Sequence, residues 1–371
     1  MLRWARERSG LPAEGLERRF PKIEKWESGE IRPTLAQLEA FAKATHAPIG
    51  FLFLREPPVE NIPLPDFRTH ANQQVRRPSP DLLDTIYLCQ QRQEWFHDYA
   101  RAGQVQALDF IGSVTPDSDI IEAATAIRAR LGFDLEERRQ CPTWTEALRK
   151  FIELADKCGV LVMVTGVVGN NNYRKLNPDE FRGFAIVDDL APLIFVNGSD
   201  TKAAQMFTLA HELAHIWLGQ SALTDAQAST FAGNRIEDWC NKVAAELLVP
   251  RAVIEAEYQR SEDLRNALDR FARRFKVSTL VVLRRIYDVG GLTRDAFWAA
   301  YEAELAHLRA VPRSSGGDFY LTQGARVGKR FARALVTSTL EGQTLHRDAF
   351  RLLGFSKLST FRELAHSLGV I

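Results

Sequence analysis

Two histidines four residues apart enclose a glutamate in the segment His211-Glu212-Leu213-Ala214-His215. On a helix this spacing places both imidazoles on one face, one turn apart, so both can bind a single metal ion at about 2.0 to 2.1 Å. Glu212 lies about 100° around the helix from His211, where its carboxylate can take a proton from water beside the metal. This HExxH pattern predicts a catalytic Zn²⁺ site.

The alternative interpretation is a buried helix in which the two histidines only form hydrogen bonds. Its core would consist of Ala203, Phe207, Ala210, Ala214 and Trp217. We favour the metal site because the motif lies in a stretch with helical character, which is the context that it requires. This helix is expected over residues 201–218, with Asp200 as its N-cap and Gly219 at its end.

A catalytic zinc site needs a third protein ligand and leaves the fourth position for water. A second helix, predicted over residues 236–249 and ended by Pro250, offers Glu237, Asp238 and Glu246. Nine residues at 100° each place Glu246 about 180° from Glu237, so the two cannot face the same ion. We choose Glu237, because Asn241 follows it on the same face and can orient a ligand. The alternative for Glu237 is a solvated acid favoured by the helix dipole.

Two imidazoles, one carboxylate and a neighbouring base are suited to hydrolysis of an amide bond. Zn²⁺ polarises a carbonyl, while Glu212 accepts the proton of the attacking water and passes it to the departing amine. A further donor normally stabilises the oxyanion. The sequence leaves several candidates open for that role: Tyr173, Arg182, Tyr258 and His307.

The elements around the motif predict an α+β domain. Helical patterns at about residues 81–102, 117–131 and 143–158 precede three β-rich runs, at residues 160–164, 184–187 and 193–196. The segment 170–172, three successive asparagines, is expected to be an exposed loop. If residues 182–187 form a sheet edge beside the cleft, an extended substrate can add to it as another strand.

Outside this domain the chain divides further. Residues 57–80 contain six of the sixteen prolines and are predicted to be a linker. Before it, residues 1–56 should form short helices at 2–9, 11–20 and from Pro21 to Trp26, and a fourth capped by Thr34 with Leu35, Leu38, Phe41 and Ala42 on one face. Residues 81–300 are assigned to the catalytic domain and residues 301–371 to a C-terminal helical module.

Charge and composition limit the class of protein. Hydrophobic residues make up 45% and charged residues 26% of the 371 residues, which excludes a mainly disordered chain. No apolar run approaches the roughly 18 residues of a membrane span, and the N-terminus has no signal core, so we expect a cytoplasmic protein. Residues 309–371 carry ten Lys and Arg against four Asp and Glu. Such a basic segment suits nucleic acid or an acidic partner, or is a solvated face.

Several segments together resemble the ImmA/IrrE family of metallopeptidases. They are Phe181-Arg182-Gly183-Phe184-Ala185, Pro192 to Gly198, Phe207 to His215, and Ala244-Ala245-Glu246-Leu247-Leu248-Val249-Pro250. The resemblance implies a zincin-like, gluzincin-type fold with a small sheet, in which His211, His215 and Glu237 bind Zn²⁺ and Glu212 is catalytic. Residues Trp26 to Glu30 and Arg32 to Thr34 are similar to the Xre-type helix-turn-helix often fused to these peptidases.

The resemblance also implies a narrow substrate range. Members of this family typically cut a partner repressor with a helix-turn-helix and thereby derepress stress, mobile-element or toxin–antitoxin genes. DNA is a further expected partner, through the N-terminal module or the C-terminal helices around Gly354. An ordinary helical hairpin packing Phe350, Leu353, Phe361 and Leu364 is the other interpretation of those C-terminal helices. The alternative function is a DNA-binding regulator or antitoxin whose peptidase domain is vestigial or senses a ligand.

Overall fold

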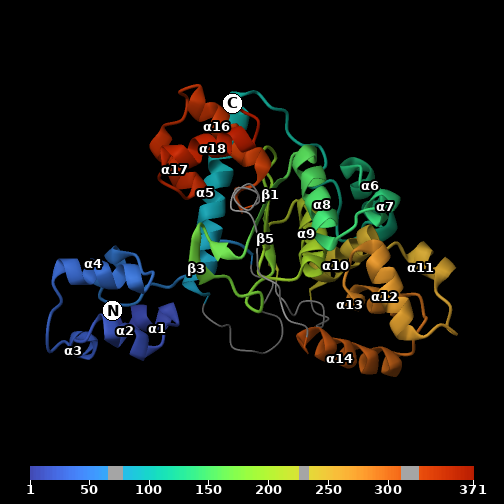
Figure 1. Cartoon of the computed structure of the whole chain (residues 1–371), viewed down its shortest axis with the longest axis horizontal. Helices are drawn as coiled ribbons and strands as arrows, with labels where there is room; N and C mark the ends of the chain where they lie inside the picture. The colour runs from blue at the N-terminus through green and yellow to red at the C-terminus, as the bar shows by residue number, and fades with distance from the viewer. Residues whose placement is uncertain (66–77, 225–233, 311–325) are drawn as a thin grey trace. The chain divides into compact units, whose positions relative to one another are not determined.

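The computed structural model describes residues 1–65, 78–224, 234–310 and 326–371 (Figure 1). Its contacts divide the chain into two compact units. The first contains Met1–Pro63 and the start of helix α5 up to Tyr87. The second contains Leu64, Pro65 and the described residues from Leu88 to Ile371. Each unit is described by itself.

The N-terminal unit is built from short helices around an aromatic core. They are α1 (Leu2–Ser9), α2 (Ala13–Arg19), α3 (Ile23–Glu27), α4 (Leu35–Ala44) and a 3-10 helix (Ile49–Phe53). Thr34 caps α4 as predicted, and its hydroxyl accepts from the Gln37 N–H in a reciprocal capping box. One expectation was wrong: α3 begins at Ile23 and not at Pro21. Of the predicted apolar stripe, Phe41 and Ala42 are buried, whereas Leu35 is 61% exposed. As the first residue of α4, Leu35 lies at an end of the apolar stripe.

The second unit contains a mixed four-stranded sheet in the order β1-β5-β4-β6. β1 (Leu161–Thr165) runs parallel to β5 (Leu193–Asn197), and β4 (Gly183–Ile186) pairs antiparallel with both β5 and β6 (Ala222–Thr224). β2 (Val167–Val168) and β3 (Asn171–Lys175) form a separate hairpin. The three β-rich runs of the sequence therefore become β1, β4 and β5.

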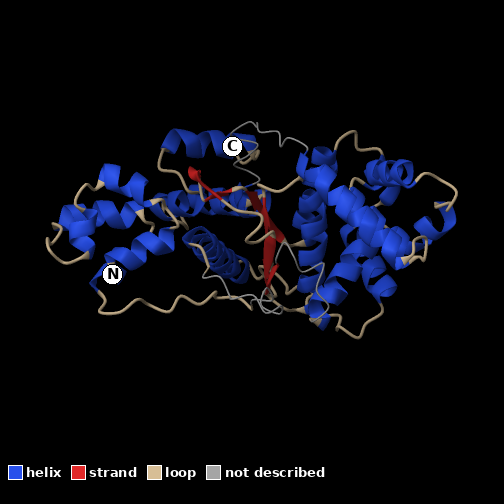
Figure 2. Cartoon of the chain, turned by 90° about the horizontal axis from the view of Figure 1, so that it is seen from below, coloured by secondary structure: helices blue, strands red, loops and turns tan. Residues whose placement is uncertain are grey.

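Helices cover both faces of this sheet (Figures 1 and 2). On one face α8 and α9 lie against it, and on the other lies the part of α5 from Leu88 onward, where Gln93 donates to the carbonyls of Ile186 and Ala191. The first helices that contribute to this unit are α5 (Pro80–Ala102), α6 (Ile120–Leu131), α7 (Leu135–Arg139), α8 (Trp144–Cys158), α9 (Lys202–Leu218) and α10 (Arg235–Leu248). The following helices are α11 (Arg251–Glu257), α12 (Leu264–Phe275), α13 (Thr279–Asp288) and α14 (Arg294–Ala310).

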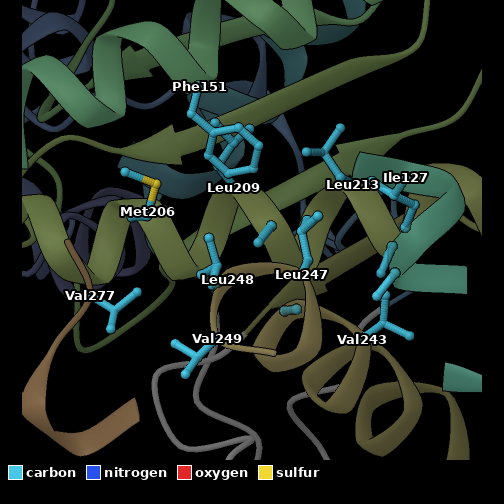
Figure 3. Packing of buried hydrophobic residues seen from close by; sticks show 14 of the residues in the cluster. Ile127, Phe151, Met206, Leu209, Leu213, Val243, Leu247, Leu248, Val249 and Val277 are labelled. Carbon is cyan, nitrogen blue, oxygen red and sulfur yellow. The ribbon is translucent and has the colours of Figure 1, made fainter. Parts of the chain in front are cut away.

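A continuous apolar core fixes α9 between its neighbours. Met206, Leu209 and Leu213 of α9 are buried with Phe151 of α8 and Leu247 of α10 (Figure 3). The three α9 residues recur at spacings of three and four and so form one stripe. Because this stripe is held by packing on both sides, the other faces of α9 have defined directions.

Two local expectations differ from the structure, and one strand was not predicted. Asn171 and Asn172 belong to strand β3 and not to a loop, because pairing with β2 outweighs the low strand propensity of asparagine. The N-cap of α9 is Thr201, whose hydroxyl accepts from the Ala204 N–H, and not Asp200. β6 was not predicted, since three residues are too few for a period-2 pattern to be visible.

β4 is an inner strand of the sheet. It is paired along both sides, with Phe184 opposite Phe195 of β5 and Leu223 of β6. The expectation that residues 182–187 form a free edge was therefore wrong, because a paired strand has no unused hydrogen-bonding groups to offer a peptide. The outer strand on this side of the sheet is β6.

The C-terminal helices pack onto the opposite edge of the sheet, beside β1. They are α16 (Lys329–Leu340), α17 (His346–Leu353) and α18 (Leu358–Ser367). Arg92 of α5 donates to the Leu352 carbonyl, and the Asn170 amide donates to the Gly354 carbonyl at 2.8 Å. Leu353, Phe361 and Leu364 are buried. The predicted start of this module at residue 301 lies within α14, and residues 311–325 lie outside the described part of the chain.

In the part of the chain that the structure describes, no helix combines the length and the apolar character needed to cross a bilayer.

Candidate metal centre

The three faces of helix α9 carry different parts of the site. His211 and His215, four residues apart, point towards α10 and lie within ion-pair distance of Glu237. Thr208 and Glu212, also four apart, approach Gly183 of β4. The remaining face holds the apolar stripe described above. The helix therefore directs two imidazoles and one carboxylate to neighbouring positions between the sheet and α10.

Ligand atoms of three side chains from two helices converge closely. The Nε2 atoms of His211 and His215 are 3.1 Å apart. Glu237 Oε2 lies 3.2 Å from His211 Nε2, and Glu237 Oε1 lies 3.0 Å from His215 Nε2. Among the described residues this is the one group of His, Cys, Asp or Glu side chains whose ligand atoms converge in this way.

These separations fit a single metal ion. Donors arranged tetrahedrally at about 2.0 to 2.1 Å from an ion are about 3.3 Å from one another. The observed separations of 3.0 to 3.2 Å approach that value for all three pairs of side chains, with a different Glu237 oxygen nearest to each histidine. All three side chains are buried, and a buried carboxylate beside two imidazoles is normally paired or bound to a metal. The residues present therefore suit a divalent cation.

The electrostatics of the three groups are coupled. Burial alone disfavours a charged His211, but the Glu237 carboxylate outweighs it and raises the pKa of this imidazole. Burial likewise disfavours a charged Glu237, yet the attraction and hydrogen bonds of the two histidines hold its pKa well below the usual range. Burial lowers the pKa of His215. Glu237 is thus held as a carboxylate, the form that binds metal.

Glu212 stands beside this cluster in a different environment. Its side chain is 0% exposed, and burial raises its pKa to about 8, although His211 and the Thr224 hydroxyl oppose the rise. Neither of its oxygens makes a hydrogen bond of good geometry with the described residues. A buried carboxyl group without such a partner indicates a missing polar neighbour such as water or substrate. A pKa near neutrality suits a group that both takes and returns a proton.

The other acidic residues of α10 are engaged elsewhere. Glu246 pairs with Arg285 of α13 at 2.5 Å and accepts the Arg251 N–H. Asp238 is exposed and pairs with Lys242. The half-turn separation predicted between Glu237 and Glu246 is thus present. Asn241 lies one turn beyond Glu237, and its proximity contributes to the raised pKa of His211, so it is placed beside that ring.

The four candidates for an oxyanion donor lie in other surroundings. Tyr173 is 98% exposed on β3. Arg182 pairs with Asp200 at 3.6 Å, and His307 of α14 is hydrogen-bonded to Arg265. Tyr258 follows α11 and packs close to Gly291. Their contacts with described residues give none of them a place in the His211–His215–Glu237 cluster.

Gly183 is a site residue that sequence reasoning did not select. A methyl group built on it would lie 2.7 Å from the Phe195 carbonyl oxygen, 2.5 Å from the Thr208 methyl group and 3.2 Å from Glu212 Oε1. Only glycine allows α9 to approach β4 this closely. A glycine at the start of a predicted strand was the available signal.

Gly183→Ala is expected to lower the free energy of unfolding by about 1 to 3 kcal/mol, because the backbone oxygen of Phe195 cannot easily move away. It should also displace Glu212 and slow any reaction that depends on it. Thermal unfolding and cleavage assays would measure the two effects. Gly15→Ala is the matched control, since nothing lies within 4 Å of the added methyl group; equal stability of both variants would contradict the close approach.

Comparison with known proteins agrees with this geometry. A profile described as the IrrE N-terminal-like domain matches residues 155–287, which include His211, Glu212, His215 and Glu237. This region is thus similar to the IrrE N-terminal-like domain, in agreement with the resemblance to the ImmA/IrrE family. A second profile, described only as a domain of unknown function, matches residues 327–367 of the C-terminal helices.

Two relatives of the ImmA/IrrE domain are named as radiation response metalloprotease IrrE. The protein of Deinococcus deserti is 32% identical over 163 residues, covering 40% of this chain and 58% of that protein. The protein of Deinococcus radiodurans is 36% identical over 91 residues, covering 23% and 28%. The chain thus spans less than two thirds of either relative. Their description as metalloproteases implies a metal cofactor for this family, and the His211–His215–Glu237 cluster is where the chain can hold it.

Proposed function

We propose that this chain is a zinc-dependent endopeptidase that makes limited cuts in a partner regulatory protein. The observation that carries the proposal is the position of Glu212, a buried carboxyl group directly beside a His-His-Glu set. Two imidazoles and one carboxylate are a known ligand set of catalytic zinc, which keeps one position open. A protein that only bound metal or DNA would not need a base at that point.

Bound zinc would supply Lewis acidity, which polarises a carbonyl group and acidifies water. The chain's own residues account for the remaining chemistry. His211, His215 and Glu237 hold the ion, and Asn241 orients His211. Glu212 accepts a proton from water on Oε1 or Oε2 and then donates it to the amine nitrogen of the departing peptide. Burial of all these groups excludes bulk water and strengthens their interactions.

For the substrate we propose a helix-turn-helix repressor, whose cleavage derepresses stress, mobile-element or toxin–antitoxin genes. Support for this comes from the family resemblance and from the relatives named as radiation response metalloproteases. Limited cleavage also suits a deeply buried site, because a folded partner reaches it only by presenting an extended segment.

The test is incubation of the purified, zinc-loaded chain with helix-turn-helix proteins encoded by neighbouring genes. We expect discrete fragments from one of them, detected by mass spectrometry. Removal of the metal with 1,10-phenanthroline should stop the reaction, and added Zn²⁺ should restore it. Cleavage that persists in the chelator would contradict a metal-dependent reaction.

A further inference from the structure

The outer edge of β6 is contacted by another segment of the same chain. β6 pairs with β4 on one side, with Gly183 opposite Thr224 and Phe184 opposite Leu223. On its other side the Leu223 N–H donates to the carbonyl of Pro65 at 3.2 Å. Leu64 and Pro65 belong to the same compact unit as the sheet, although they lie far from β6 along the chain.

The segment that makes this contact bends at Pro63 and Leu64 and places one side chain in the interior. Leu64 is 8% exposed, whereas Pro63 and Pro65 on either side of it are exposed. Pro65 has no N–H to donate, so the segment accepts a hydrogen bond from β6 without offering a regular ladder in return. It is anchored by one buried side chain and is therefore displaceable.

This edge leads directly to Glu212. Gly183, whose added methyl group would lie 3.2 Å from Glu212 Oε1, is opposite Thr224, the residue after Leu223. The contact with Pro65 thus lies one residue along β6 from the point where the sheet meets the base. Glu212 and the His-His-Glu set are buried. An extended polypeptide that reached them along β6 would need the hydrogen-bonding groups that Pro65 uses.

We propose that Leu64–Pro65 is a built-in competitor of the substrate, which occupies the β6 edge and must leave it before an extended polypeptide segment can add there. This inference rests on the proposed peptidase function. The contact would limit which substrates are cleaved, because only a segment that binds the β6 edge more tightly than Leu64–Pro65 can reach the site. Displacement requires no change in the metal ligands, because the contact lies on the outer side of β6.

The first test replaces Leu64, the buried anchor. With unfolded β-casein as the probe, Leu64→Ser should raise the cleavage rate by roughly three- to tenfold, because a tethered segment competes at an effective concentration in the millimolar range. Leu64→Ala should give a smaller rise. Val59→Ser is the matched control in the same segment, since Val59 is 86% exposed. A synthetic peptide of residues 59–65 should suppress the extra activity of Leu64→Ser; unchanged cleavage in both Leu64 variants would overturn the proposal.

The second test needs no catalysis and separates the two proposals. Hydrogen exchange of the Leu223 amide should accelerate in Leu64→Ser but not in Val59→Ser, both alone and combined with Glu212→Gln. Suppose that Leu64→Ser, with Glu212 intact, shows faster Leu223 exchange and tighter casein binding but no cleavage. This result would refute the peptidase function and support the role of Leu64–Pro65 as a competitor. Normal zinc-dependent cleavage with unchanged Leu223 exchange would refute the competitor and keep the peptidase.

Discussion

Glu212→Gln is expected to leave the metal content unchanged while the cleavage rate falls by about 10² to 10⁴-fold, the usual contribution of a positioned acid–base group. Glutamine has the same shape as glutamate but cannot accept the proton of the attacking water. The structure makes the substitution well tolerated, because the side chain is buried between α9 and β4 without a partner that requires its charge. Burial already favours the neutral form, raising the pKa of Glu212 to about 8. Folding should therefore be unaffected.

Metal analysis, thermal unfolding and cleavage of the partner protein together measure this result. Glu122→Gln, an exposed residue in the first turn of α6, is the control for the same chemical change. Retained cleavage in Glu212→Gln would remove this residue as the base. It would also favour the alternative of a DNA-binding regulator with a vestigial peptidase domain, for which salt-dependent binding to its own upstream DNA is the corresponding measurement.

Glu237→Ala and Glu246→Ala are expected to separate metal binding from stability. Glu237→Ala removes one of three converging donors, so zinc affinity should fall by more than about a hundredfold, since even residues one shell further out are worth 10- to 100-fold. Glu246→Ala should leave the zinc content unchanged. Its cost should appear in the free energy of unfolding, at about 1 to 3 kcal/mol, because the buried Arg285 loses its closer carboxylate partner and keeps Asp288 at 3.5 Å.

The two variants are matched, since they change the same residue type on the same helix. Zinc content per chain and denaturant unfolding are the measurements. Adding Arg285→Met to Glu246→Ala should recover part of the lost stability by removing the buried charge that has lost its closer partner. Loss of zinc in Glu246→Ala with retention in Glu237→Ala would show that the third ligand was chosen wrongly.

Three arginines surround the C-terminal end of α10, where Glu246 lies, so Glu246 has a role in stability and not in metal binding. Arg128, Arg138 and Arg285 donate to the carbonyls of Glu246, Leu248 and Val249, respectively. Cations at a helix C-terminus are favoured by its dipole and satisfy carbonyls that have no partner within the helix. These contacts come from α6, α7 and α13, so they fix the helix that carries Glu237 from three directions.

The sequence by itself determined the features that depend on local periodicity. A spacing of four residues placed His211 and His215 on one face of α9, and helical rotation separated Glu237 from Glu246 on α10. Runs of β-branched and aromatic residues marked β1, β4 and β5. Gly219 and Pro250 marked where α9 and α10 end. These features follow from the backbone geometry of a single element and need no partner.

Tertiary structure alone decided how those elements meet. The order β1-β5-β4-β6 made β4 an inner strand, and the packing of α9 on β4 required Gly183. Glu246 pairs with Arg285, which lies 39 residues further along the chain on α13. The contact of Pro65 with Leu223 joins segments with no shared local pattern. Residues distant in sequence are brought together by the burial of apolar side chains and by strand pairing. Neither leaves a periodic signal in either segment.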